Sequence, residues 1–142
     1  MLASTVALPI VDLDLFADCT RSQLHQIAAL TTGLHIPRDH VLIRQDGLAG
    51  EFIVIRSGSA HVTRAVNGGV VQVADVGAGD FLGEMALLNG TRRTATVTAA
   101  TDLDVLVSSV GEFRSILEIA PSVARKVRRA SLARTSSMAI AA

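Results

Sequence analysis

Gly83, Glu84 and Arg93 are the residues of this chain whose types and spacing best suit the binding of a small anionic ligand. A glycine lets the backbone approach a ligand closely, and the free N–H groups of the helical turn that follows it face an anion. An arginine can close on a phosphate with two parallel N–H donors, and a glutamate can accept from a hydroxyl. Asn89 and Gly90 reverse the chain after the turn and return the arginine toward the glutamate. This equipment suits a ligand that carries both a sugar and a phosphate.

The segments around these residues predict a mainly β fold. From Ile36 onward, short runs of β-branched residues alternate with turn residues, a pattern typical of many short strands folded into a sandwich or roll. Asn67 and Gly68 predict a tight hairpin, because both residue types adopt the positive φ angles of such a turn. The predicted strands are 41–44, 51–56, 60–66, 70–76, 93–98 and 103–108.

A cyclic nucleotide is one ligand that this arrangement fits. Its phosphate charge, ribose 2′-hydroxyl and apolar purine face match Arg93, Glu84 and the Val-, Leu- and Ile-rich strands in turn. The alternative is an ion pair between Glu84 and Arg93 that ties a loop to a strand without any ligand. Because burying such a pair is costly and often adds little stability, its retention favours a ligand, but the residues alone leave both interpretations open.

Helices are predicted on both sides of the strands. Thr20 opens a capping-box pattern that predicts a helix over 21–31. Ser109 opens a second capping box and a short helix, which Pro121 ends or breaks. A last helix is expected to begin near Ser122, and its apolar stripe is thin, so we expect it to be the moving part.

Composition excludes several classes of protein. No apolar run approaches the ~20 residues of a membrane helix, and the start of the chain lacks the pattern of a signal peptide, so a cytoplasmic location without membrane contact is predicted. Cys19 is the only cysteine, which argues against a disulfide framework. No serine or threonine lies in a nucleophile-elbow context, so no catalytic residue and no enzyme activity are predicted. Four histidines lack metal-ligand spacing, so no metal site is predicted: His25, His35, His40 and His61.

Charge is distributed unevenly, although the formal net charge is zero. No acidic residue follows Glu118, whereas five cations crowd the C-terminal end: Arg125, Lys126, Arg128, Arg129 and Arg134. Such a tail can be a solvated helix face, or it can contact nucleic acid or an acidic partner. The chain has four Phe and no Trp or Tyr, so it lacks stacking platforms for single strands, and nucleic acid is an unlikely partner.

The segment from Phe81 to Val97 resembles the phosphate-binding cassette of cyclic nucleotide-binding domains. These domains occur in catabolite activator proteins, cyclic-nucleotide-dependent protein kinases and cyclic-nucleotide-gated channels. The Gly-Glu, Ala-Leu, Arg and Ala-Thr-Val elements are all in register, and the resemblance extends over about 14 to 126. It implies an eight-stranded β-roll, or jelly roll, with one N-terminal helix and two C-terminal helices. The whole chain is then expected to be a single domain, with a helical lead-in over 14–34, the roll over 35–109 and C-terminal helices over 110–137.

The resemblance also implies roles for individual residues. Glu84 would accept from the ribose 2′-hydroxyl, Arg93 would pair with the cyclic phosphate, and Gly83 would allow the close approach. Three backbone N–H groups would complete the anion cradle, those of Met85, Ala86 and Ala95. Three side chains would contact the sugar and base: Phe81, Leu82 and Val73.

Two positions bear on selectivity and register. Thr94 follows the key arginine, where the family often has threonine when cyclic GMP is tolerated, so both cyclic AMP and cyclic GMP stay open. Arg92 stands where the family commonly has proline, and the register with the Ala-Thr-Val element assigns the phosphate to Arg93.

The last helix, which covers the base in this family, contains no aromatic residue. A cap would therefore come from an arginine stem or from one of three aliphatic residues: Val127, Leu132 or Met138.

The predicted function is that of a stand-alone cyclic nucleotide sensor. It would bind cyclic AMP first and cyclic GMP second, and would signal through movement of the C-terminal helix to a protein partner or a second copy. Two alternatives are a degenerate roll that serves only dimerisation or docking, and a nucleic-acid-binding protein that uses the basic helix.

Overall fold

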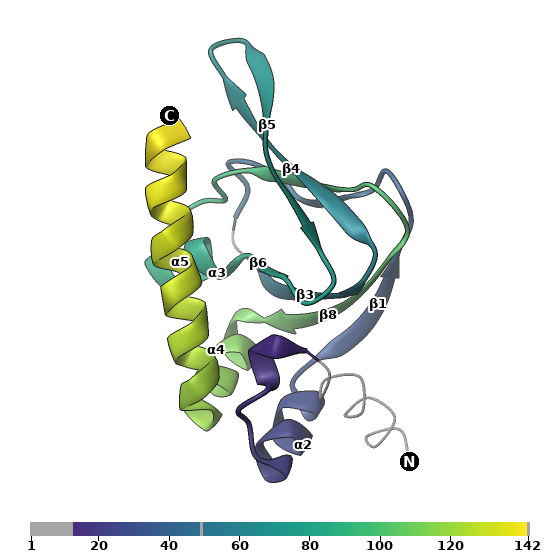
Figure 1. Cartoon of the computed structure of the whole chain (residues 1–142), viewed down its shortest axis with the longest axis vertical. Coiled ribbons are helices and arrows are strands. Elements are labelled where there is room, and N and C mark those ends of the chain that lie inside the picture. The colour runs from purple at the N-terminus through teal and green to yellow at the C-terminus, as the bar shows by residue number, and fades with distance from the viewer. Residues whose placement is uncertain (1–12, 49, 142) are drawn as a thin grey trace.

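The computed structural model describes residues 13–48 and 50–141. Eight strands form two four-stranded antiparallel sheets that pack face to face as a β-roll, which confirms the predicted fold class (Figure 1). The first sheet has the order β1 (Thr32–Ile36), β8 (Leu103–Ser109), β3 (Glu51–Ser57) and β6 (Phe81–Leu82). The second has the order β2 (Val41–Ile43), β7 (Thr96–Ala99), β4 (Ser59–Val66) and β5 (Gly69–Gly77).

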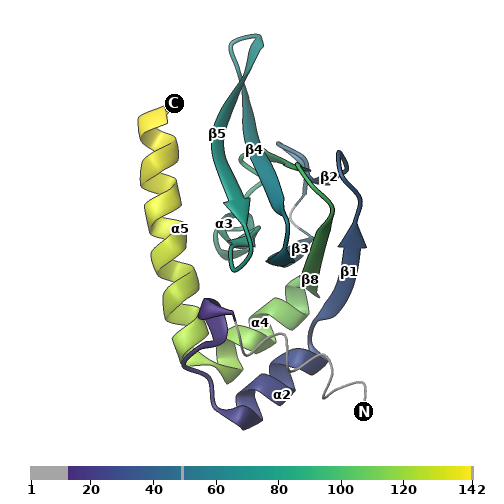
Figure 2. The same ribbon diagram turned by 45° about the vertical axis from the view of Figure 1, so that its right-hand side comes forward.

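The helices gather at one end and along one side of the roll (Figures 1 and 2). A 3₁₀ turn, η1 (Asp14–Phe16), and helix α2 (Arg21–Ala29) precede the strands, and α4 (Val110–Ile119) and α5 (Pro121–Ala141) follow them. The short helix α3 (Glu84–Asn89) lies between β6 and β7 in the chain and packs against α5. The side of α5 that faces the roll therefore also faces the segment that carries Glu84.

Local sequence signals account for the helix starts. The Thr20 hydroxyl accepts from Gln23 N at 3.1 Å, and the Gln23 side chain accepts from Thr20 N at 2.8 Å, so the predicted capping box is present. Ser109 and Glu112 form the second box at 3.2 and 2.9 Å. Pro121 begins α5 instead of only ending α4, because the first helical position needs no N–H.

The hydrophobic core has two parts. One lies between the two sheets, and the other lies between the first sheet and the helices. In the second part, Phe52 stacks on Phe113 of α4 with 4.5 Å between ring centroids and also contacts Phe81 at 5.7 Å. These rings connect β6, beside the candidate site, to the C-terminal helices.

Several predicted boundaries are corrected. The first helix ends at Ala29, not at residue 31, and strand β1 begins at Thr32, inside the predicted helical lead-in over 14–34. Pairing decides this: Thr32 to Ile36 are matched against β8 from Val107 to Leu103, a partner far away in the sequence. The predicted hairpin is present, with Asn67 and Gly68 at positive φ between β4 and β5.

The predicted strand 93–98 begins only at Thr96. Arg93 instead bonds through its backbone to the loop after β2, accepting from Asp46 N at 2.8 Å and donating to Gly47 O at 2.9 Å.

Across residues 13–48 and 50–141, no helix combines the length and apolar character needed to cross a membrane. The cytoplasmic location stays a prediction.

Candidate functional site

A pocket of about 420 Å³ opens between the second sheet, α3 and α5. Its wall is apolar over most of its area, and its charged groups are Glu84, Arg93 and Arg134. Eight of the ten predicted site residues line it: Val73, Leu82, Gly83, Glu84, Ala86, Arg93, Thr94 and Ala95. The other eight were not predicted as site residues from the sequence: Ile43, Val62, Val71, Gln72, Ala74, Val76, Val97 and Arg134.

Gly83 is the residue that lets α3 begin next to the arginine. It has a φ of 92° and serves as the N-cap of α3. A Cβ built at this position would lie 2.5 Å from Arg93 Nη1 and 2.6 Å from Glu51 O. Both the left-handed backbone and the lack of space therefore require glycine here.

Arg93 is a buried cation held by backbone oxygens. Its side chain is on the pocket wall, and the residue is 7% exposed. Nη2 donates to Glu51 O at 2.7 Å and Nη1 donates to Gly83 O at 3.1 Å. Among the described residues, no carboxylate lies within ion-pair distance of the guanidinium.

The environment of Arg93 disfavours its charge. Burial lowers the pKa of Arg93, and the more distant carboxylates of Glu51 and Glu84 act in the opposite direction. A guanidinium has five N–H donors, of which two are used on the backbone carbonyls. The site thus presents a fixed, partly desolvated positive charge that still has unused N–H donors. Such a group suits the binding of an anion.

Glu84 is the other buried charge, and it is already paired. The residue is 1% exposed, and Arg134 Nη1 donates to Oε2 at 2.7 Å and also contacts Oε1. Burial raises the pKa of Glu84, while the charge and hydrogen bonds of Arg134 lower it. Glu84 therefore depends on α5 for its main counter-charge.

The ion pair between Glu84 and Arg93 that the sequence left open does not form between these two described residues. Each uses other partners: Glu84 pairs with Arg134, and Arg93 bonds to backbone carbonyls. The two charges face the same pocket instead of neutralising each other. The purely structural role proposed for that pair thus has no support in its geometry.

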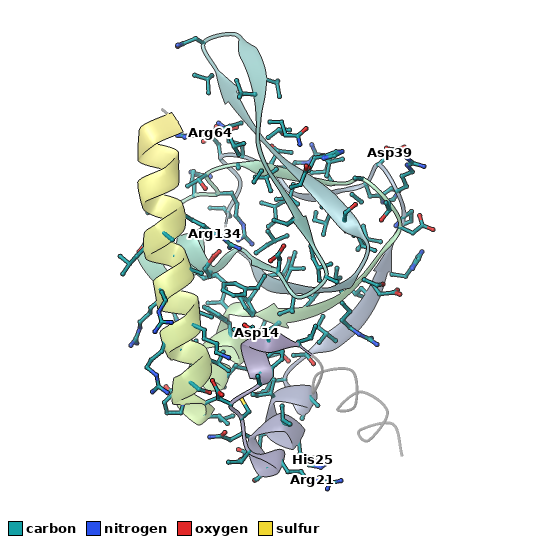
Figure 3. The ribbon with its side chains drawn as sticks, viewed as in Figure 1. Asp14, Arg21, His25, Asp39, Arg64 and Arg134 are labelled. Atoms are coloured by element: carbon teal, nitrogen blue, oxygen red, sulfur yellow. The ribbon has the colours of Figure 1, made fainter. Side chains whose placement is uncertain are left out.

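Arg134 was recognised from the sequence only as one of five tail cations and as a possible arginine stem. Figure 3 shows Arg134 on the side of α5 that faces the roll. Its guanidinium carbon is 5.0 Å from the Phe81 ring centroid. The sequence did contain a signal for the position of Arg134. Spacings of four and seven residues place it on the same helix face as Val123 and Val127. Both valines are fully buried, so the same face carries Arg134 to the pocket.

The remaining site predictions fall in different places. Phe81 is buried against the helices and underlies Arg134, but it is not on the pocket wall. Thr94 is half-buried on the wall, directly after Arg93. Arg92 is exposed and donates to Asp46 O at 3.1 Å. Met85 lies in the first turn of α3, and its side chain lies outside the described part.

Of the aliphatic residues considered as a cap, Val127 is buried in the helix-side core and Leu132 is exposed to solvent. The side chain of Met138 lies outside the described part of the chain. Within the described residues no cluster of His, Cys, Asp or Glu could hold a metal ion.

The fold and site together define a β-roll domain with a pocket whose wall carries a buried guanidinium, and comparisons with known proteins identify its family. Residues 34–119 match the cyclic nucleotide-binding domain model, and the chain belongs to this family. It is 37% identical over 116 residues to the acetyltransferase Pat of Mycolicibacterium smegmatis, which covers 82% of this chain and 35% of that protein. The chain thus spans about a third of the length of this curated relative.

Solved structures agree with this assignment. A cAMP-binding acyltransferase from Mycobacterium smegmatis superimposes with a TM-score of 0.73 at 33% identity, over 89% of this chain and 40% of that one. The regulatory domain of Toxoplasma gondii PKA with cAMP superimposes with a TM-score of 0.81 over 91% of this chain and 49% of that one. Its identity is 21%, so this second likeness shows the fold alone.

Proposed function

We propose that the pocket binds cyclic AMP, with cyclic GMP as a second ligand, and that binding acts through α5 on a partner. The observation that carries this proposal is Arg93, a buried guanidinium on the pocket wall whose bonds go to backbone oxygens instead of carboxylates. A buried cation without an anionic partner is costly unless a ligand supplies the charge. The family and the similarity to a cAMP-binding acyltransferase support a cyclic nucleotide as that ligand.

In this proposal the phosphate lies against Arg93 and the first turn of α3. Two N–H groups of Arg93 are used on Glu51 O and Gly83 O, and the unused donors serve the phosphate. The backbone N–H groups of Met85, Ala86 and Ala95 complete the cradle. Because the two backbone bonds hold the guanidinium in one orientation, little side-chain freedom is lost when the anion binds.

The ribose then lies against Glu84, whose carboxylate accepts from the 2′-hydroxyl. Both oxygens of that carboxylate are engaged by Arg134. A 2′-hydroxyl that bonds to Glu84 must share or replace one of these contacts. Nucleotide binding is thereby coupled to the position of α5.

The base lies against the apolar wall, with Leu82 and Val73 as contacts and Thr94 as the hydroxyl that accommodates guanine. Phe81 packs under Arg134 and supports it, and does not contact the base directly. The stem of Arg134 can cover the site, since Arg134 is the one residue on the pocket wall among the α5 side chains that the structure describes.

The proposed role is regulatory, with residues 1–142 as one binding domain that carries no catalysis of its own. Signalling to a protein partner, or to a second copy, would run through α5. The ligand can shift α5 only by the difference in its affinity for the two positions of that helix.

Isothermal titration calorimetry with cyclic AMP and cyclic GMP tests the proposal directly. We expect saturable heat for cyclic AMP and weaker binding of cyclic GMP. 5′-AMP, whose open phosphate monoester carries an extra negative charge and lacks the cyclic phosphodiester ring, is the control for a general anion site. Heats of dilution alone for both cyclic nucleotides would overturn the proposal.

A further inference from the structure

Helix α5 has a second face that turns away from the roll. Arg125, Arg128, Arg129 and Leu132 are spaced by three, one and three residues, which places them together on one side of the helix. The residues that contact the core, Val123 and Val127 among them, lie on the opposite side. All four members of this outer face of α5 are exposed.

The three arginines of the outer face form no ion pair with the described residues. The ion pairs of α5 involve only its other cations: Lys126 lies 3.3 Å from an Asp18 carboxylate oxygen, and Arg134 pairs with Glu84. Three neighbouring guanidinium groups without counter-charges repel one another and concentrate a positive potential. The chain has a formal net charge of zero, so this is a local feature of α5 and not a consequence of an overall basic protein.

Leu132 adds an apolar side chain to the basic face. It is 72% exposed, in contrast to the buried valines on the opposite side of the helix. A single exposed leucine is ordinary. Leu132, however, lies seven residues after Arg125 and on the same side of the helix as the arginines, so the outer face combines charged and apolar side chains. Such a face can bury one apolar side chain of a partner and surround that contact with charge pairs.

We propose that the outer face of α5 is a docking surface for an acidic amphipathic segment of a partner protein. Charge complementarity selects this occupant. Guanidinium groups bind carboxylates and phosphates through paired N–H donors, and the exposed Leu132 on the same face adds an apolar contact that an amphipathic protein segment can fill. A second copy of the chain would bring an identical set of arginines against the first, so a face-to-face dimer through this surface is disfavoured.

The proposal does not depend on nucleotide binding, because none of its residues lines the pocket. Arg134 lies on the same helix two residues after Leu132, so α5 would carry the ligand contact on one side and the partner contact on the other. The docking surface is thus a place where movement of α5 could be sensed.

The test uses the full chain and a fluorescein-labelled synthetic peptide of Glu, Ala and Leu, designed as an acidic amphipathic helix and followed by fluorescence anisotropy. The key variant replaces Arg125, Arg128 and Arg129 with Gln, and a second variant is Leu132→Ala. A matched control removes the same charge from three exposed arginines elsewhere: Arg21, Arg38 and Arg44 to Gln. Circular dichroism melting checks that each variant is folded.

We expect the α5 triple variant to lose about tenfold or more in peptide affinity, as three surface charge pairs of ordinary strength would give. Leu132→Ala should lose about threefold. The control triple variant should bind like the parent chain. No peptide binding, or equal losses for the two triple variants, would overturn the proposal.

Two further probes separate the other occupants. A DNA duplex of random sequence and vesicles of phosphatidylcholine with phosphatidylglycerol are titrated at the same salt concentrations. Binding of either that is tighter than binding of the peptide, and that is lost in the α5 triple variant, would assign the face to nucleic acid or to an anionic membrane and contradict a protein partner.

Discussion

Arg134 of α5 donates to both carboxylate oxygens of Glu84 at the start of α3, although the two residues are 50 positions apart in the sequence. Glu84 is fully buried, and Arg134 is stacked over Phe81. This ion pair joins the proposed ribose acceptor to the last helix of the domain. In the proposed function, this pair makes the state of the pocket and the position of α5 interdependent.

Arg93→Ala should reduce cyclic AMP affinity by about 100-fold or more, since it removes the charged donor from a buried site. Calorimetry measures the change. Arg92→Ala is the matched control, because Arg92 is adjacent, exposed and outside the pocket. If Arg93→Ala retained its affinity for cyclic AMP and Arg92→Ala lost it, the phosphate contact would have to be assigned to Arg92.

Gly83→Ala should both destabilise the fold and impair binding. The new Cβ would lie 2.5 Å from Arg93 Nη1 and 2.6 Å from Glu51 O, and the φ of 92° strains any side chain. We expect a loss of about 2 kcal/mol or more in the free energy of unfolding. Gly90→Ala shares the positive φ but meets nothing within 4 Å, so it should cost about 1 kcal/mol and spare binding. Equal effects of the two changes would contradict the close approach at Gly83.

Glu84→Gln should change how stability depends on pH. Because burial raises the pKa of Glu84 above its ordinary value of 4.5, the folded protein holds this proton more tightly than the unfolded chain. The resulting contribution to stability is fully present below pH 4.5 and is lost as the pH rises through the raised value. The parent chain should therefore lose stability relative to the variant over that range in urea unfolding.

The control for this experiment is Glu118→Gln, which removes an exposed carboxylate from α4. A difference between the parent and Glu84→Gln that stays constant with pH would show that the burial of Glu84 does not perturb its titration.

Arg134→Ala should loosen the link between the pocket and α5. It leaves the buried Glu84 carboxylate without its main partner, and we expect a loss of about 1–3 kcal/mol in the free energy of unfolding. Hydrogen exchange should become faster in α3 and in the part of α5 around residue 134. Arg129→Ala, on the outer face of the same helix, should leave exchange in α3 unchanged, and faster exchange there would argue against a specific role for Arg134.

Thr94→Ala should lower the affinity for cyclic GMP more than the affinity for cyclic AMP. The side chain lies on the pocket wall beside Arg93, and one lost hydrogen bond to guanine corresponds to about a fivefold to tenfold loss. Competition of both nucleotides against a fluorescent cyclic AMP analogue gives the ratio directly. Equal losses for the two nucleotides would remove Thr94 from base selection.

Features that depend on neighbouring residues could be predicted from the sequence. The two capping boxes, the Asn67-Gly68 hairpin and the glycine before α3 each arise from the conformational preferences of a few consecutive residues. The apolar runs of the strands likewise predicted a sandwich or roll, and the Gly-Glu and Arg elements lie on the pocket wall. Strand β1 could not be predicted in this way, because Thr32–Ile36 owe their extended form to pairing with β8.

The sequence by itself therefore determined the β class of the fold and the residues that supply the charge proposed to bind the phosphate, since local propensity and residue chemistry suffice for both. Only the tertiary structure decided that Arg93 is held by the carbonyls of Glu51 and Gly83, and that Glu84 pairs with Arg134. The physical reason is that burial and long-range packing choose among possible partners. Five cations lie near the C-terminus, and only the one whose helix face meets α3 can reach the buried carboxylate.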